Sequence, residues 1–215
     1  MPAAPVITPR IEAKAVPVVL RMAVWVSVVI AAAAVIRRLF ALASPASSGP
    51  PDLASLDETF RQHAVLTVAH IVPALIFVVL AAAVLFRKSE WAERLLFPIG
   101  AIVGMTAYAM SAYSIGGWVE RSAVFVFDTI FLYSLWRAFQ LRQEPAHKRR
   151  WMIRAIVVLL GIATTRPVMG VFFATSRVTH LTPAQFFGIA FWIGFSINLV
   201  AVEVWLRKRN QRGKF

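Results

Sequence analysis

Six apolar runs, each near the length that crosses a lipid bilayer, constrain the fold of this chain more than any other feature. A helix needs about 20 mainly apolar residues to span the hydrocarbon of a bilayer. The runs cover residues 18–36, 64–86, 95–115, 122–139, 151–174 and 186–206. With 59% hydrophobic residues, the chain also lies outside the composition of soluble domains. We therefore predict an all-α membrane protein, a polytopic bundle of six transmembrane helices.

The positive charges between the runs predict the orientation. Fourteen Lys and Arg residues fall on one side of the predicted membrane, whereas the other side holds Arg37, Arg38, Arg61, Arg121 and Arg177. Because Lys and Arg are enriched in cytoplasmic loops, we expect both termini in the cytoplasm. The net charge of +13 is spread between the spans instead of being clustered on one face, which argues against a nucleic-acid partner. Membrane lipids are the expected partners.

The chain divides into a six-span domain, residues 18–206, and two tails. Residues 1–17 carry four prolines and no apolar periodicity, so we expect a flexible cytoplasmic tail. Residues 207–215 form a basic cytoplasmic tail that attracts anionic lipid. A competing interpretation treats the first run as a signal peptide that is cleaved at the Ala-Leu-Ala of residues 41–43. Arg37 and Arg38 directly follow the apolar run, as in a stop-transfer segment, and they favour an uncleaved helix.

Three ionisable residues fall inside the apolar runs at similar depth: His70, Asp128 and Arg166. A charged side chain at the centre of a spanning helix costs about 2.5–3.5 kcal/mol on insertion scales, and it usually faces protein or water. An ion pair with further hydrogen bonds offsets much of this cost. We therefore predict that Asp128 and Arg166 pair in the outer half of the bilayer, where His70, Tyr108 and Asn198 complete a polar ligand-binding pocket. The alternative is an ion pair that only holds two helices together.

Several residues predict local features of the helices. Pro167 is expected to loosen the helix beside Arg166, because proline removes a backbone donor. Residues 182–185 have the form of a capping box at the start of the last span. Gly100 and Gly104 form a GxxxG pattern, which permits close contact between helices.

The remaining charged and capping residues suggest ordinary structural roles. Residues 55–58 have the form of another capping box, so the second helix is expected to begin before the membrane does. Trp151 suits the membrane interface. Arg154 can extend its side chain toward the headgroups, and Glu203 can do the same or pair with Arg207.

Part of the chain resembles a bacterial membrane-protein family catalogued as domain of unknown function 2306. The resemblance covers about residues 63–207. It is carried by His147, Trp151, Met152, Arg154 and Arg166, by the closing pattern of Trp192, Asn198, Glu203 and residues 205–207, and by His70 and Pro73. This chain has Glu93 and Arg94 where the family usually has a His-Arg pair. The resemblance implies a multi-pass protein of the bacterial inner membrane and places weight on Arg166, but it implies no reaction.

Four hypotheses for the function remain open at this stage. The first is the binding of a small amphipathic molecule, quinone-like or lipid-like, in the pocket of His70, Tyr108, Asp128, Arg166 and Asn198. The second is a membrane-embedded enzyme in which Asp128 or His70 acts as the acid or base and Arg166 stabilises negative charge. The third is a transporter or proton path. The fourth is an assembly scaffold, with an oligomer or a larger membrane complex left open.

A haem cofactor is not favoured by the histidines. Haem held by two histidines needs both axial ligands at matching depth on facing helices. His63 shares a helix face with His70, His147 is predicted on the other side of the membrane, and only His180 could reach across. The chain has no cysteine, which excludes disulfides, thiol nucleophiles and Cys metal sites. No recognised catalytic motif is present in the sequence.

Overall fold

The computed structural model describes residues 18–43, 51–87 and 89–212, and the regular structure within these ranges is entirely helical. The helices are α1 Val18–Ala43, α2 Pro51–Gln62, α3 Ala64–Arg87, α4 Glu90–Ser111, α5 Gly117–Gln140, α6 Pro145–Leu159, α7 Gly161–Thr179 and α8 Pro183–Arg212. The predicted flexible tail, residues 1–17, lies outside the described residues. The predicted basic tail begins as a helix, because α8 continues to Arg212.

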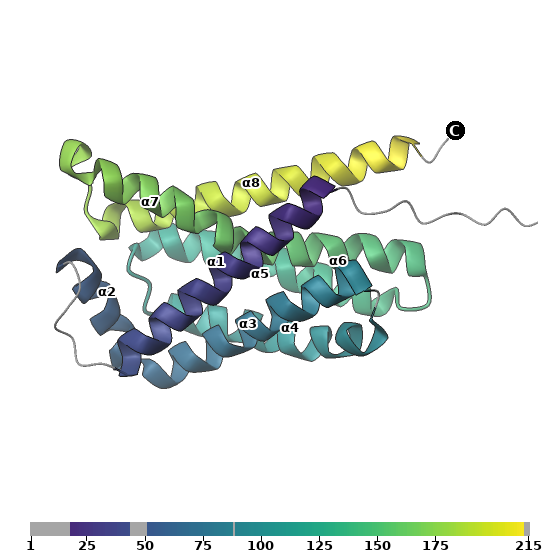
Figure 1. Ribbon diagram of the computed structural model, residues 1–215, viewed down its shortest axis with the longest axis horizontal. Helices are drawn as coiled ribbons and strands as arrows, with labels where there is room; N and C mark the ends of the chain where they lie inside the picture. Colours follow the sequence, from purple (N-terminus) through teal and green to yellow (C-terminus); the bar gives the residue numbers. More distant parts are fainter. Residues whose placement is uncertain (1–17, 44–50, 88, 213–215) are drawn as a thin grey trace, which may run out of the picture.

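Six helical stretches within the described residues are long and apolar enough to cross a membrane, which confirms the predicted all-α bundle. Helices α1, α3, α4, α5 and α8 each contain one span. The fifth span in chain order combines α6 and α7, which follow one another from Pro145 to Thr179. Because adjacent spans alternate in direction, α1 begins and α8 finishes at the same end of the bundle (Figure 1). We call this end the basic end, since it carries the basic connections and the basic end of α8.

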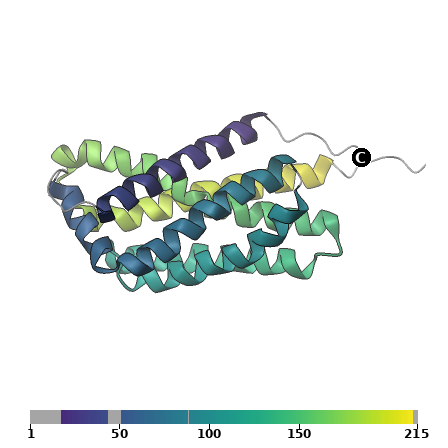
Figure 2. The ribbon, with the colours of Figure 1, turned by 60° about the horizontal axis from the view of Figure 1, so that its bottom comes forward.

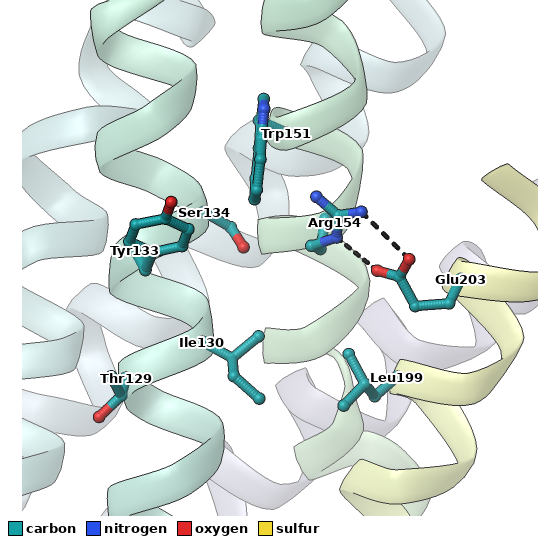
Figure 3. Close-up of a pocket in the computed structure, with 8 residues that line it drawn as sticks. All are labelled: Thr129, Ile130, Tyr133, Ser134, Trp151, Arg154, Leu199 and Glu203. Carbon is teal, nitrogen blue, oxygen red and sulfur yellow. Dashed lines mark hydrogen bonds and ion pairs between the residues drawn. The ribbon is translucent and has the colours of Figure 1, made fainter. Parts of the chain in front are cut away.

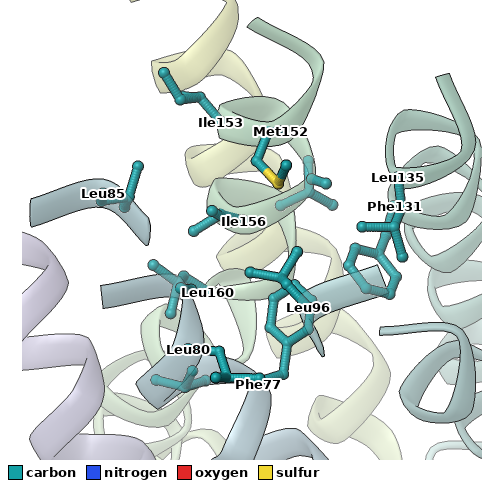
Figure 4. Close-up of a cluster of buried hydrophobic side chains, with 14 of the residues drawn as sticks. Phe77, Leu80, Leu85, Leu96, Phe131, Leu135, Met152, Ile153, Ile156 and Leu160 are labelled. Carbon is teal, nitrogen blue, oxygen red and sulfur yellow. The ribbon is translucent and has the colours of Figure 1, made fainter. Parts of the chain in front are cut away.

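The core is an apolar cluster between α3, α4, α5 and α6 (Figure 4). Phe77 of α3 and Phe131 of α5 meet edge to face, with their ring centroids 5.5 Å apart. Leu96 of α4 and Ile156 of α6 are fully buried beside them. Burial of each such side chain contributes about 1.5–3 kcal/mol in water, but within lipid the gain comes mainly from close packing.

Glycines allow this close packing. A Cβ atom on Gly100 would lie 2.6 Å from Leu135 Cδ2 and 2.9 Å from Phe77 Cε2. A Cβ atom on Gly104 would lie 2.7 Å from Leu132 Cγ. The close helix contact predicted from the GxxxG pattern is therefore confirmed, and α4 uses it to receive side chains from both α3 and α5.

The span made of α6 and α7 is broken at Leu160. This residue caps α6, its N–H donates to the carbonyl of Ile156, and its own carbonyl accepts from the N–H of Ala163 only three residues on. The expectation that Pro167 would loosen the helix beside Arg166 is wrong in position: α7 continues through Pro167, and the interruption lies at Leu160, about two turns earlier. The tightened turn at Leu160 ends one helix and starts the next.

Asn198 of α8 bridges this break. Its Nδ2 donates to the carbonyl of Val157 at 2.9 Å, in the last turn of α6. Its Oδ1 accepts from the hydroxyl of Thr164 at 2.7 Å, in the first turn of α7. Carbonyls in the last turn of a helix lack a partner within the helix, so the Asn198 amide replaces a bond that the break removes. Asn198 therefore joins three helices.

Helix α1 lies obliquely across the outside of the bundle, where it contacts α3 and α7 (Figures 1 and 2). Only 6% of its apolar stretch is buried, so most of its surface is available to lipid. Helix α2 is separate from the second span, because a turn at His63 divides it from α3. The predicted capping box at residues 55–58 thus lies within α2. At α8 one half of the predicted capping box is present: the side chain of Gln185 accepts from the backbone N–H of Thr182 at 2.9 Å, whereas the Thr182 hydroxyl donates to that side chain instead of accepting from the backbone of Gln185.

Candidate functional site

A groove of about 500 Å³ lies between α5, α6 and α8. Its lining residues come from all three helices: Thr129, Ile130, Tyr133 and Ser134 of α5, Trp151 and Arg154 of α6, and Leu199 and Glu203 of α8 (Figure 3). The groove opens on the surface of the bundle, where Tyr133 is 49% exposed. In a membrane this opening faces lipid, so a molecule dissolved in the bilayer can enter from the side.

An ion pair between Arg154 and Glu203 forms the polar wall of the groove. The guanidinium contacts both carboxylate oxygens, through Nε to Oε1 and through Nη2 to Oε2 at 3.1 Å. Bidentate pairs of this type have a fixed geometry and are among the stronger hydrogen-bonded contacts in proteins. The pair joins α6 to α8. It corrects the two expectations for these residues, since Arg154 faces a carboxylate inside the bundle and Glu203 pairs with Arg154 instead of Arg207.

Aromatic rings lie against this ion pair. The guanidinium carbon of Arg154 is 4.3 Å from the ring centroid of Trp151. Tyr133 packs edge to face on the same ring at 5.5 Å. A cation held over Trp gains further stabilisation, estimated at about 0.5–2 kcal/mol. The polar wall is therefore a fixed unit of one ion pair and two rings.

Ser134 adds an unused hydroxyl at the groove. The residue is fully buried, and its Oγ makes no hydrogen bond with any residue in the described part of the chain. A buried hydroxyl without a partner costs about 1–3 kcal/mol, so such a group usually serves a bound molecule or water. Ile130 and Leu199 give the other end of the groove an aliphatic surface.

The structure does not bring the predicted pocket residues together. His70 of α3 is hydrogen-bonded through Nδ1 to the hydroxyl of Thr106 in α4 at 3.0 Å. Tyr108 of α4 is hydrogen-bonded through its hydroxyl to Thr129 of α5 at 2.6 Å. The side chain of Asn198 is already hydrogen-bonded to Val157 and Thr164 on either side of the break between α6 and α7. Of the predicted ligand-binding residues, only Tyr108 reaches a residue that lines the groove.

The predicted ion pair between Asp128 and Arg166 is wrong. None of the ion pairs among the described residues joins them. Arg166 is exposed on α7, which packs against α8 and α1, whereas Asp128 lies on α5, on the far side of α8. The two residues have similar depth, but they face different sides of the bundle.

Asp128 is buried without a partner. Asp128 is only 8% exposed, and its Oδ2 atom forms no hydrogen bond with the described residues. Phe125, one turn before Asp128, stacks on Tyr108 of α4. Leu132, one turn after it, packs on Gly104 of α4. Asp128 therefore lies toward the α4 side of α5. An unpaired carboxyl at this depth is costly and marks a position with a role beyond packing.

Comparisons of the chain with protein-family models, with curated proteins and with solved structures found no match. The resemblance to the bacterial family of unknown function and the location in an inner membrane therefore remain predictions from the sequence. Within residues 18–43, 51–87 and 89–212, no group of three His, Asp or Glu side chains is arranged to hold a metal ion.

The groove residues carried a signal in the sequence. Arg154 and Glu203 each lie inside a predicted span, about one turn from its end at the basic side. Arg154 and Glu203 match in depth just as Asp128 and Arg166 do. A position near the membrane interface explains each of the two residues separately, so depth alone does not identify them as a pair.

Proposed function

We propose that this membrane protein binds a small amphipathic molecule, quinone-like or lipid-like, in the groove between α5, α6 and α8. The observation that carries the proposal is the groove itself, which combines a fixed polar wall with an aliphatic end in about 500 Å³. Binding sites for small molecules usually have about 300–1,000 Å³, mostly apolar walls and a few well-placed polar groups.

The two ends of the groove define how the molecule would lie. Its polar head takes a hydrogen bond from Arg154 and lies against the packed rings of Trp151 and Tyr133. Its apolar part extends along Ile130 and Leu199 toward the middle of the bilayer. Trp and Tyr are enriched at membrane interfaces, which agrees with a head near the basic end.

This proposal keeps the ligand class predicted from the sequence but moves the site. The expected pocket of His70, Asp128 and Arg166 was in the outer half of the bilayer, whereas the groove lies toward the basic end. The acid–base roles suggested for Asp128 and His70 gain no support from their positions, because each is separated from Arg166 and from the polar wall.

Photoaffinity labelling of the purified full-length protein in detergent micelles tests the proposal. The probes are a quinone with an azido group and a fatty acid with a diazirine in its chain. Peptides of α5, α6 or α8 that contain groove residues are expected to carry the label. Leu199→Trp places an indole in the groove and is expected to lower the labelling about tenfold, which corresponds to about 1.4 kcal/mol.

Val200→Trp is the matched control. It adds the same side chain at the next position of α8, where the residue is 61% exposed on the outside of the bundle. Labelling in this variant should equal that of the wild type. Equal labelling in both Trp variants, or label spread evenly over the lipid-facing helices, would contradict a specific site. The two probes separate a quinone-like from a lipid-like ligand.

A further inference from the structure

Two arginines of α1 share one aspartate of α2 at the end of the bundle opposite the basic end. Arg37 and Arg38, near the end of α1, both pair with Asp57 of α2, and the Arg37 Nη2 to Asp57 Oδ2 distance is 3.1 Å. The guanidinium of Arg38 also lies over the ring of Phe60, with its carbon 4.0 Å from the centroid. The side chains of Arg38 and Asp57 are only 14% and 18% exposed. Two guanidinium groups therefore share one carboxylate.

Arg166 adds a third positive charge from α7. Helices α1 and α7 pack together, and Arg166 lies within electrostatic reach of both Arg37 and Arg38. No carboxylate of the described residues lies within 4.0 Å of Arg166. We call Arg37, Arg38, Arg166 and Asp57 the arginine cluster. Three positive charges face one negative charge, so the cluster has an excess of two positive charges.

An excess of positive charge at this position requires an anion. Asp57 is already shared by Arg37 and Arg38, and Arg166 has no carboxylate of its own within 4.0 Å in the described part of the chain. Arg166 also lies within a membrane-spanning stretch, where an unpaired charge is costly. A second, external anion removes this cost. The site therefore points to a ligand and cannot be explained by its internal ion pairs.

The chemistry of the cluster favours a phosphate group. Guanidinium groups present planar forks of N–H donors that match phosphate and carboxylate oxygens, and several forks can bind one phosphate together. A phosphate presents at least two anionic oxygens, so more than one guanidinium can bind it, whether it is a headgroup diester with one negative charge or a free ion with up to two. Arg37 and Arg38 directly follow the apolar run of residues 18–36, so the α1 side of the cluster lies near the expected boundary between hydrocarbon and headgroups, and Arg166 approaches it from within its span.

We propose that the arginine cluster is a binding site for a phosphate group at the membrane surface. A phospholipid headgroup and a free phosphate ion share this chemistry, and the experiment below distinguishes them. The site is independent of the groove: it is built by α1, α2 and α7, whereas the groove is built by α5, α6 and α8.

Native mass spectrometry of the purified full-length protein tests the lipid source. The protein is prepared with phosphatidylglycerol and phosphatidylcholine in equal amounts, and the retained lipid is counted. We expect selective retention of phosphatidylglycerol by the wild type. Arg166→Gln removes one excess charge without breaking the pairs to Asp57, and it should lower that retention about tenfold, because it removes charge-assisted hydrogen bonds to the phosphate.

Arg177→Gln is the matched control. Arg177 lies on the same helix and toward the same end of the bundle, where it is exposed in the last turn of α7. Its replacement removes the same charge from the chain and should leave lipid retention unchanged. Arg37→Gln provides a second test, since its side chain is 48% exposed and tolerates replacement, and it should also lower retention.

Isothermal titration with inorganic phosphate in neutral detergent tests the free-ion source. Binding that is lost in Arg166→Gln and Arg37→Gln but kept in Arg177→Gln would identify free phosphate. Selective lipid retention without phosphate binding would identify the headgroup. Equal behaviour of all three variants and the wild type in both assays would overturn the proposal.

Discussion

Replacement of Asn198 by alanine tests whether this side chain holds the two halves of the broken span together. The substitution removes the donor to the Val157 carbonyl and the acceptor of the Thr164 hydroxyl. The two losses differ. Thr164 can turn its hydroxyl to a carbonyl of its own helix, as Thr commonly does. The Val157 carbonyl has no such substitute, because it lies at the break.

The magnitude follows from this difference. Hydrogen bonds between transmembrane helices contribute about 0.6 kcal/mol on average and about 1.7 kcal/mol at most. A buried carbonyl left without a partner costs about 1–3 kcal/mol. We therefore expect Asn198→Ala to lower the free energy of unfolding by about 2 kcal/mol. Thr164→Val removes only the weaker bond and should cost about 0.6 kcal/mol.

Equilibrium unfolding of the purified protein measures these effects. Mixed micelles of a mild detergent and sodium dodecyl sulfate unfold the helices reversibly, and far-ultraviolet circular dichroism follows the transition. Ser196→Ala is the control, because the Ser196 hydroxyl on the same helix forms no hydrogen bond with the described residues. A free energy for Asn198→Ala equal to that of Ser196→Ala, within about 0.3 kcal/mol, would refute the bridging role.

Two further predictions concern the packing and the orientation of the helices. Gly194→Ala should lower the free energy of unfolding by about 1–3 kcal/mol in the same assay, because the new Cβ would lie 2.7 Å from the backbone nitrogen of Thr165. Gly170→Ala is the control and should leave the free energy of unfolding unchanged, because a Cβ at Gly170 meets nothing within 4 Å. Equal effects of the two substitutions would contradict close packing at Gly194. Because the chain has no cysteine, single introduced cysteines can report the orientation of the helices. Thr182→Cys should react with a membrane-impermeant maleimide in intact cells, and Gln143→Cys should react only after lysis. The opposite result would place the termini outside the cell.

The sequence was sufficient to predict the six membrane spans, because the length of an apolar run by itself identifies a helix that can cross the hydrocarbon of a bilayer. The half of the capping box that forms at Thr182 and Gln185 was predictable for a similar reason, since its chemistry is local. The break at Leu160 was not predictable in this way. The one local signal is Gly161, which directly follows Leu160, but a single glycine in an apolar run is also explained by close packing, here against Phe195, so only the packing of α8 and its Asn198 identifies the break.

The candidate site shows a different limit. A rise of 1.5 Å per residue gives the depth of a side chain, and similar depth is the one property of His70, Asp128 and Arg166 that the sequence provides. A shared pocket also requires that the side chains face the same space. His70 is hydrogen-bonded to Thr106 of α4, whereas Arg166 lies on α7, which packs against α1 and α8, so equal depth alone did not bring them together.

The break at Leu160 explains why Arg166 turns away from the core. Arg166 follows Met152 by fourteen residues, which is close to four turns at 3.6 residues per turn. In an unbroken helix it would therefore continue the face of Met152, which is buried in the core. In α7 the buried face is instead formed by Gly161, Thr165 and Met169. The interruption thus directs α7 toward α8 and leaves Arg166 on the side of α1. It therefore separates the arginine cluster, to which α7 contributes, from the groove, which α6 helps to form.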